Sequence, residues 1–373
     1  MLESLAPHIA RTRSLVIQAD QDIYNASLLF CDPAPLLQRL EILTYEDVVH
    51  LPDNFLGQQA PSLRFVSLDS VCPRLESLFP LPNLTEFRLS LVNGATSFRV
   101  GALFQFLSES PLLRKVGVNV HNRSAQDISL DKVISLESLV ELDCGCDCVS
   151  QVIPFLRLPR LARLRVTSLP LSARQAQTLA DVLPYDSCAL LARVTKMLYL
   201  SDLLESSHKV ELSGNGVDVS FRKFHTTADT TLVDWPPHQT RIPFGQIEDL
   251  EFRGGPPFPT GFPINVFALE NLRVLRVALF QQEPTKRLLR ALHPGPGAAE
   301  IPCRPLQEIE VYYTYWGSQG PLPRLLVSLV REKKQAGCQL RLVCLVIERG
   351  GSGHRGLLEE LKEYVGEVGT RER

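Results

Sequence analysis

Three cysteines alternate along one short segment, Asp143-Cys144-Gly145-Cys146-Asp147-Cys148. Thiolates bind zinc, but a structural zinc site needs four ligands, commonly supplied as Cys-x-x-Cys pairs or together with histidines. If the segment is a strand, the three thiols share one face of it, because side chains two positions apart point the same way. A thiol in that position also packs as a small apolar group. The segment therefore has two interpretations, core packing or metal and redox chemistry.

A second candidate for chemistry is the glycine-rich run Gly350-Gly351-Ser352-Gly353-His354-Arg355-Gly356, which has the composition of a phosphate-binding loop. A Walker loop ends in Lys-Ser/Thr at a fixed spacing, and that ending is missing, so a flexible connector is the favoured interpretation. The eight histidines include no His-x-x-x-His pair, and no Gly-x-Ser-x-Gly elbow is present. We therefore predict that the chain is not an enzyme and has no catalytic residues, metal site or cofactor.

The elements that position these residues follow from a repeated phrase of the form apolar-x-x-apolar-x-apolar. It recurs about ten times, mostly at intervals of about 20 to 30 residues, which is the signature of a leucine-rich-repeat solenoid. Solenoids of this kind usually present a binding surface rather than an active site. The copies begin at Leu37, Leu63, Leu84, Leu113, Leu139, Leu161, Ile247, Leu272 and Leu306, with an earlier copy at Thr12 and a last one at Leu340.

Each copy is expected to form one short strand whose apolar positions point into the core. The predicted fold is an α/β leucine-rich-repeat solenoid. It is expected to be a curved horseshoe with about ten or eleven strands, in a mostly parallel concave sheet. Helices and irregular loops are expected on the convex side. The asparagine that bonds the turn in regular repeats is absent, so the repeat is divergent.

The predicted domain organisation is an irregular solenoid over residues 1–349, with an irregular middle at 184–243, and a C-terminal capping helix and tail over 350–373. One continuous solenoid is favoured over two separate domains. In the middle, Leu190 to Leu198 suggest a helix. The segments on either side of Gly214-Asn215-Gly216 are interpreted as two strands joined by a glycine turn, or as one degenerate repeat and its return. Further helices are expected at 173–183, after Pro321, and from Leu357 to Val365.

The residues between the apolar positions line the predicted concave face and carry both signs of charge in rows. Mixed charge suits a protein partner with complementary charge and disfavours a polyanion such as nucleic acid. The alternative is that these are solvated strand positions that pair with one another. The predicted partner-binding residues are Arg88, Lys115, Arg163, Arg165, Glu251, Arg276 and Glu310, with Tyr312 as an aromatic anchor.

The totals restrict the class of protein further. The net charge is −2, which gives no electrostatic attraction to nucleic acid or to an anionic membrane. Met1 to Arg13 contain no apolar core of a signal peptide, and no run of about 18 apolar residues predicts a membrane span. The nine cysteines are scattered and odd in number, so we interpret them as reduced thiols of a cytoplasmic or nuclear protein.

Two stretches carry a resemblance to a known family. Leu5-Ala6-Pro7-His8-Ile9 with Arg13-Ser14-Leu15-Val16-Ile17, and Leu190-Leu191-Ala192-Arg193-Val194 through Val210-Glu211-Leu212-Ser213-Gly214, resemble the repeat region of fungal, basidiomycete-type F-box/leucine-rich-repeat proteins. In that family an F-box module before the repeats docks the adaptor of a cullin-type ubiquitin ligase, and no such module is seen here.

The resemblance implies a non-catalytic recognition module that binds the substrates of an F-box-type ubiquitin-ligase receptor. The ligase adaptor would be a partner only if an F-box exists upstream. The alternative is a stand-alone interaction scaffold.

Overall fold

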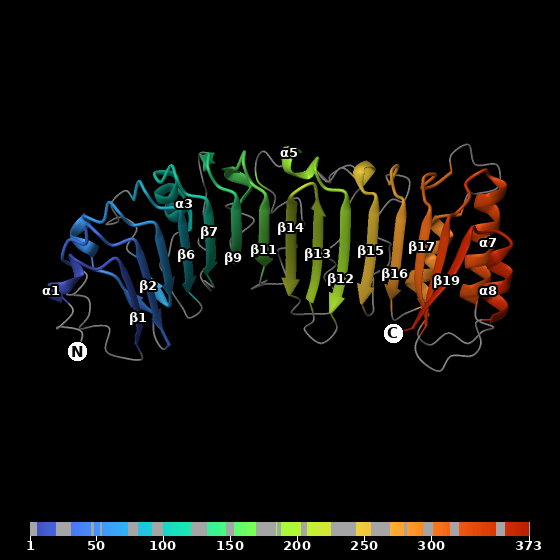
Figure 1. Cartoon of the computed structure of the whole chain (residues 1–373), viewed down its shortest axis with the longest axis horizontal. Helices are drawn as coiled ribbons and strands as arrows, with labels where there is room; N and C mark the ends of the chain where they lie inside the picture. Colours follow the sequence, from blue (N-terminus) through green and yellow to red (C-terminus); the bar gives the residue numbers. More distant parts are fainter. Residues whose placement is uncertain are drawn as a thin grey trace. The chain divides into compact units, whose positions relative to one another are not determined.

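The computed structural model of the 373-residue chain describes residues 6–19, 31–45, 48–52, 54–73, 81–91, 100–120, 133–146, 153–168, 184, 188–202, 207–224, 244–254, 269–279, 282–293, 301–313, 321–347 and 355–372. The chain forms two compact units, which we name unit 1 (Met1–Leu190) and unit 2 (Leu191–Arg373) (Figure 1). Both units are built on a sheet, so the α/β class is confirmed together with the mostly parallel sheet.

Unit 1 contains a sheet in which every neighbouring pair of described strands is parallel. Each strand coincides with one copy of the apolar phrase, and the register places equivalent positions of successive copies side by side, as Leu40 lies beside Val66. In order the strands are β1 (Ser14–Ala19), β2 (Arg39–Thr44), β4 (Phe65–Asp69), β6 (Glu86–Leu91), β7 (Lys115–Val120), β9 (Glu141–Cys146) and β11 (Arg163–Ser168).

The same turn precedes each of these strands from β2 onward. The backbone N–H of the first apolar residue of the copy donates to the carbonyl three residues earlier, as Leu63 donates to Ala60 at 3.1 Å. Proline suits the second position of such a turn because its fixed φ matches the backbone there. In unit 1 that position is held by Pro35, Pro61, Pro82, Pro111 and Pro159.

Short elements return the chain on the core side of the unit-1 sheet. Helix α3 is one of them, and its Leu103, Phe104 and Leu107 are fully buried. Gly57 has φ +53°, and a Cβ there would lie 2.9 Å from the Pro33 ring, so this return segment requires glycine. The elements are α1 (Ala6–Ile9), β3 (Val49–His50), η3 (Phe55–Gln58), β5 (Val71–Cys72), α3 (Val100–Ser108), β8 (Ile134–Ser135), η5 (Ile153–Phe155) and β10 (Leu156–Arg157).

The curved horseshoe is not confirmed, because within each unit the sheet is open and not curled. Unit 1 gives a physical reason. Part of its return path consists of the parallel pairs β3–β5 and β8–β10. Strands in such pairs are about 4.8 Å apart, the same spacing as in the main sheet. Successive copies therefore have the same spacing in the main sheet and in the return path. With equal spacing on both sides, the stack of copies does not bend.

Unit 2 begins with a hairpin and continues as a parallel sheet. β12 pairs antiparallel with β13 and parallel with β15, and β13 and β14 are joined at Asn215 and Gly216, as the glycine turn predicts. From β15 onward all described neighbours are parallel. The strands are β12 (Lys196–Asp202), β13 (Ser207–Gly214), β14 (Val217–Phe224), β15 (Asp249–Gly254), β16 (Val274–Leu279), β17 (Glu308–Tyr313), β18 (Leu342–Ile347) and β19 (Glu367–Glu372).

The helix predicted at 190–198 is wrong. The short helix α5 (Cys188–Leu191) ends there, and Lys196 already begins β12. Val194 donates its N–H to Leu191 in the repeated turn, so Val194-x-x-Met197-x-Tyr199 is a further copy of the phrase. Its third apolar position holds a tyrosine, which is 3% exposed and packs 6.3 Å from the ring of Phe252. The copy was missed because the apolar residues from Leu190 to Leu198 also fit the spacing of a helix, and because a tyrosine is less apolar than the usual third residue.

The C-terminal part of unit 2 combines predicted and unpredicted elements. The helices expected after Pro321 and around Leu361 are present as α7 (Pro321–Gln335) and α8 (Arg355–Lys362). The short η7 (Phe244–Gln246), helix α6 (Gln282–Ala291) and strand β19 were not expected. The helix predicted at 173–183 lies outside the described residues. The sequence prediction of one solenoid over 1–349 followed by a cap stays a prediction.

Candidate recognition faces of the two units

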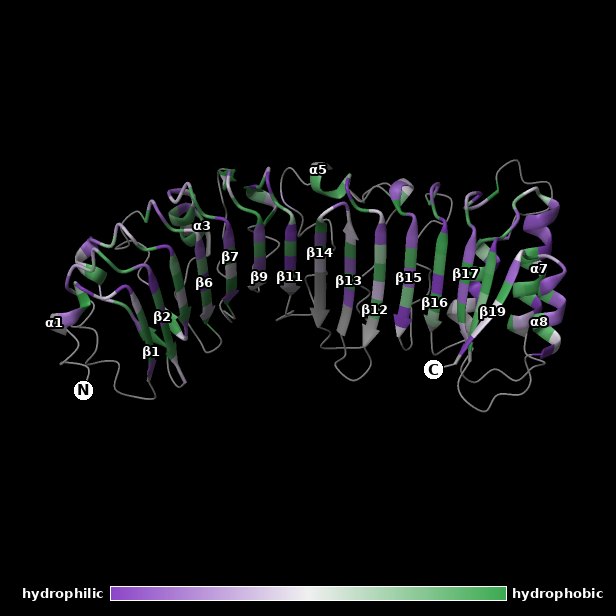
Figure 2. Ribbon diagram, in the orientation of Figure 1, coloured by the Kyte–Doolittle hydropathy of each residue, from purple (hydrophilic) through white to green (hydrophobic). Residues whose placement is uncertain are grey.

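The two faces of the strands differ in burial along most of the described repeats, whereas in β18 both faces are buried. In β2 the burial alternates, with Leu40 and Ile42 in the core and Arg39 and Glu41 on the other side, which we name the outer face. Figure 2 shows the alternation as hydrophobic and hydrophilic bands along the strands. Because strand side chains point alternately to the two faces, a polar side chain on the outer face does not disturb the core. The outer face is therefore the part of each unit where side chains can vary without a change in core packing.

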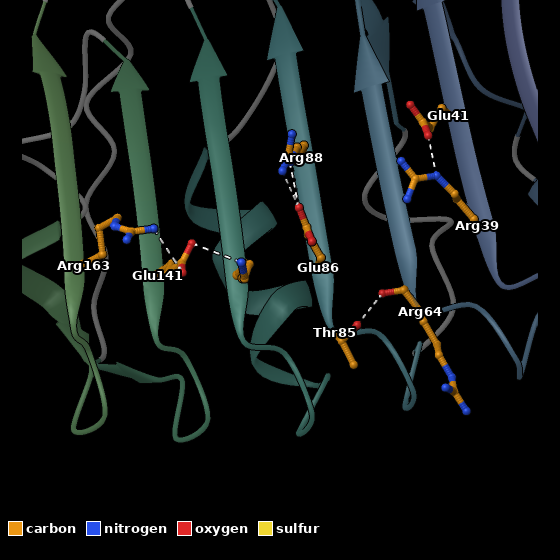
Figure 3. Close-up of polar contacts among 9 residues, drawn as sticks. Arg39, Glu41, Arg64, Thr85, Glu86, Arg88, Glu141 and Arg163 are labelled. Carbon is orange, nitrogen blue, oxygen red and sulfur yellow. Dashed lines mark hydrogen bonds and ion pairs between the residues drawn. The ribbon is translucent and has the colours of Figure 1, made fainter. Parts of the chain in front are cut away.

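On the first strands of unit 1, an aromatic ring lies between two arginines. The Arg39 guanidinium lies 4.1 Å from the centroid of the Phe65 ring, and that of Arg88 lies 5.8 Å away. Each arginine also pairs with a carboxylate on its own strand, Arg39 with Glu41 at 2.5 Å and Arg88 with Glu86 at 2.6 Å (Figure 3). Cation–π contact and ion pairing together hold these long side chains across the face.

Further along unit 1, ion pairs cross from strand to strand. Glu141 on β9 lies 3.4 Å from Lys115 on β7. It also lies 3.2 Å from Arg163 on β11 (Figure 3). In the next row Asp143 is in register with Arg165. Burial raises the pKa of the Asp143 carboxyl above its ordinary value, and the charges of Arg165 and Arg88 partly offset the rise. The face thus holds both signs of charge in mutual contact.

Gly117 interrupts the row of side chains on this face. It is in register with Arg88 on one side and with Asp143 on the other. A Cβ placed there would lie 3.6 Å from Cγ of Arg88, an ordinary contact distance. Nothing in the backbone requires glycine at this position, and the missing side chain lets Arg88 and Asp143 act on each other across it.

In unit 2 the outer face carries a longer series of ion pairs. Arg276 on β16 bonds Asp249 on β15 at 2.5 Å and lies 3.7 Å from Glu310 on β17. Glu310 in turn lies 3.5 Å from Arg371 on β19. The hydrogen bond to Asp249 is the main reason why the pKa of Arg276 is raised. Glu251 pairs in the same way with Arg253 on its own strand and raises the pKa of that guanidinium.

We expect Arg276→Ala to lower the free energy of unfolding by about 1 kcal/mol, because the pairs are partly exposed and therefore weak. Glu310 keeps Arg371 as a partner, which limits the loss. The loss should shrink in 1 M salt, since screening weakens such pairs. Urea unfolding at low and high salt measures both quantities. A loss above about 3 kcal/mol, or one unaffected by salt, would contradict the assignment of these pairs to a solvated face.

The structure places all eight predicted partner-binding residues on an outer face, but in two sets. Tyr312 is half-buried there, in register with Val346 of β18. Arg371 was missed, because β19 falls in a segment interpreted as a tail. Unit 1 carries Arg88, Lys115, Arg163 and Arg165, and unit 2 carries Glu251, Arg276, Glu310 and Tyr312.

The cysteine segment is described in part. Cys144 lies on the core face of β9 and is fully buried, which is what core packing requires of it. Cys148 lies outside the described residues, as do residues 348–354, which hold most of the glycine-rich run. Within the described ranges no group of three or more His, Cys, Asp or Glu side chains is placed to hold a metal ion.

A Ser–Glu–His cluster joins α7 to the end of α6. Glu332 lies 3.0 Å from Nδ1 of His293 and accepts the hydroxyl of Ser328 at 2.9 Å. Burial raises the pKa of the Glu332 carboxyl, but its bonds with His293 and Ser328 outweigh burial and leave the pKa lowered. A nucleophile relay needs the hydroxyl against the imidazole rather than the carboxylate. The cluster therefore lacks the order of a hydrolase triad and reads as a contact between two helices.

No helix in the described segments combines the length and the apolar character that crossing a bilayer requires. No family model matches the chain, and no curated protein matches its sequence.

Proposed function

We propose that the chain is a non-catalytic protein-recognition module whose outer faces bind a protein partner. The observation that supports the proposal is the arrangement of charged side chains on the two outer faces. These side chains form rows that core packing does not explain, and their ion pairs connect neighbouring strands. Mixed charge of this kind favours specificity for a protein and disfavours nucleic acid or an anionic membrane.

We also propose that the repeats form a divergent leucine-rich-repeat solenoid. The support is the agreement between the apolar phrase, the repeated turn and the parallel register within each unit. Repeats of this class contact mainly their neighbours and commonly present an extended surface of side chains to a partner. The proposed location, cytoplasmic or nuclear, rests on the scattered cysteines alone.

The resemblance to F-box/leucine-rich-repeat proteins extends the proposal to substrate binding for a ubiquitin ligase. A stand-alone interaction scaffold is the alternative, and the outer faces suit both. The coding sequence upstream of Met1 separates them: an in-frame F-box, with the ligase adaptor co-purifying with that longer protein, supports the ligase receptor. An upstream sequence without an F-box, and purification without the adaptor, supports the scaffold.

The test of recognition is affinity purification from the native cell with charge-reversed variants of each face. We compare the wild type with Arg88→Glu/Arg165→Glu in unit 1 and with Arg276→Glu in unit 2. The matched control is Arg287→Glu, an exposed arginine on α6. With at least one outer-face variant, the yield of the partner should fall at least about fivefold. A fivefold fall corresponds to a loss of about 1 kcal/mol of binding free energy.

Circular dichroism must show that all variants stay folded. The proposal fails if both outer-face variants recover the same partners as the wild type at the same yield. It also fails if Arg287→Glu weakens recovery as much as they do.

A further inference from the structure

A second charged feature lies at the start of the strands in unit 1, apart from the outer face. In each repeat from β1 to β9, the residue directly after the first position of the phrase gives its carbonyl to two N–H groups of the next repeat. Arg64, for example, accepts from Thr85 and Glu86 at 2.8 and 3.0 Å. These carbonyls connect one repeat directly to the next, so the positions stack at the strand spacing. From β1 to β11 they hold Arg13, Gln38, Arg64, Thr85, Arg114, Val140 and Ala162.

Arginine occupies alternate positions of this stack, at Arg13, Arg64 and Arg114, and we name these three the arginine row. All three are exposed, and none forms an ion pair with another residue of the described ranges. The residues between them, Gln38 and Thr85, are neutral. Figure 3 shows the Arg64 side chain extending away from the Arg39–Glu41 pair of the outer face. The row thus presents guanidinium groups that no residue of the described ranges neutralises.

The spacing of the row defines the ligand that fits it. Alternate strands are about 9.6 Å apart, twice the interstrand distance of about 4.8 Å. A polyproline II peptide has three residues per turn and rises about 3.1 Å per residue, so every third side chain returns to one face after about 9.3 Å. A carboxylate at every third residue therefore meets each arginine in turn, and a guanidinium accepts a carboxylate with two parallel hydrogen bonds.

We propose that the arginine row binds an extended acidic peptide with Glu or Asp at every third position. Glu109 and Glu137 are exposed in neighbouring turns and repel any anion, which favours a ligand with spaced charges over one with a charge at every residue. Single-stranded nucleic acid also needs aromatic side chains on which bases stack. The described residues of this stack supply none. The inference does not rest on the outer faces as a binding site.

Unit 2 offers a matched control in the same structural position. Arg273 gives its carbonyl to Gln307 and Glu308 at 2.8 and 2.9 Å, as Arg64 does to its next repeat. Its side chain is likewise exposed, but Glu248 holds the preceding position of the stack. The next arginine of that stack, Arg341, is already paired with Glu308. Charge reversal at Arg273 therefore repeats the chemical change without touching the arginine row.

The experiment measures the binding of a fluorescent peptide to the full chain by anisotropy at low salt. The first peptide, which we name the spaced peptide, has nine residues with a glutamate at every third position. Its other residues are neutral and mostly proline. A second peptide of identical composition has its glutamates adjacent. We expect the spaced peptide to bind about fivefold more tightly than the second. Arg64→Glu should weaken its binding about tenfold, Arg273→Glu and Arg88→Glu should leave it unchanged, and salt should weaken it.

Three results overturn the inference, provided that circular dichroism shows folded variants. The first is that the spaced peptide does not bind at millimolar concentration. The second is that the wild type binds both peptides with equal affinity. The third is that Arg64→Glu and Arg273→Glu bind the spaced peptide with equal affinity. Loss of binding in Arg88→Glu with retention in Arg64→Glu would move the peptide to the outer face. That result would also reject the arginine row while leaving the proposed recognition function intact.

Discussion

Leu164→Asp should lower the free energy of unfolding by at least about 3 kcal/mol. Leu164 is 1% exposed in β11 and lies in register with Leu142, which is equally buried. The substitution removes apolar packing and places an unpaired carboxylate in the core, and both changes are costly. Urea unfolding followed by circular dichroism measures the loss. Amide hydrogen exchange should show a larger loss of protection in β9 and β11 than in β16 and β17, because each repeat is stabilised mainly by its neighbours.

The matched control is Thr167→Asp on the same strand. Thr167 points to the outer face and faces Gly145, so the new carboxylate meets no like charge in its own register. We expect a change of less than about 1 kcal/mol, as for most surface substitutions. Similar losses in the two variants would show that the assignment of the two faces is wrong.

Lys333→Ala should be nearly as damaging, with a loss of about 3 kcal/mol. Lys333 on α7 is fully buried, and its Nζ donates to the carbonyls of Pro302 and Cys303 at 2.6 and 3.1 Å. Cys303 has φ +46° and begins the turn before β17. The lysine therefore holds a strained turn from within the core. Lys333→Met keeps most of the volume and should lose about 1 to 2 kcal/mol, the part that belongs to the hydrogen bonds.

The same lysine predicts a pH dependence. Burial lowers the pKa of Lys333 below its ordinary value of 10.5, so the folded chain releases this proton before the unfolded chain does. The unfolded state then binds more protons between the lowered pKa and 10.5, and this group's contribution to stability rises with pH across that window. The stability of the wild type relative to Lys333→Met should therefore increase from pH 8 to pH 10.5.

Using Lys333→Met as the reference removes the effect of burial on Cys303 and leaves only the effect of the Lys333 charge, which lowers the pKa of that thiol. Burial raises the pKa of that thiol to about 11, and the thiol is present in both proteins. A stability difference that stays constant or shrinks as the pH rises would show that Lys333 is not desolvated in the folded chain. Equal stability of Lys333→Ala and the wild type at pH 7 would contradict its role at the turn.

The strands could be predicted from sequence where all three positions of the phrase are clearly apolar. Leu63-x-x-Val66-x-Leu68 fixes which residues enter the core, because side chains alternate along a strand. The copy at Val194-x-x-Met197-x-Tyr199 was not recognised, because the apolar residues from Leu190 to Leu198 also fit helical spacing and the third position holds a tyrosine, which carries a polar hydroxyl. The last strand, β19, was missed for a related reason. Val368 is its one aliphatic residue, and its neighbours are glycine, threonine and charged residues, which give no apolar alternation.

The candidate site could be predicted only as rows of residues. The sequence places Glu141 on the outer face, because Leu142 beside it is apolar. It does not show that Glu141 lies between Lys115 and Arg163, since that contact depends on the register of β7 and β11 against β9. The pair of Glu310 with Arg371 depends likewise on a strand that the pattern does not reveal. The arginine row became visible only through the shared carbonyls that align successive repeats.

Site-specific photo-crosslinking in an extract of the native cell tests most directly whether the outer face is a recognition surface. A benzophenone amino acid replaces Ser67 or Gly117 on the outer face of unit 1, and, as a control, the exposed Gln105 of α3. The probes at the outer-face positions should give an adduct of one defined mass. The Arg88→Glu/Arg165→Glu substitutions should abolish this adduct, and the probe at Gln105 should not form it. No adduct from Ser67 and Gly117, or the same adduct from Gln105 alone, would contradict outer-face recognition in unit 1.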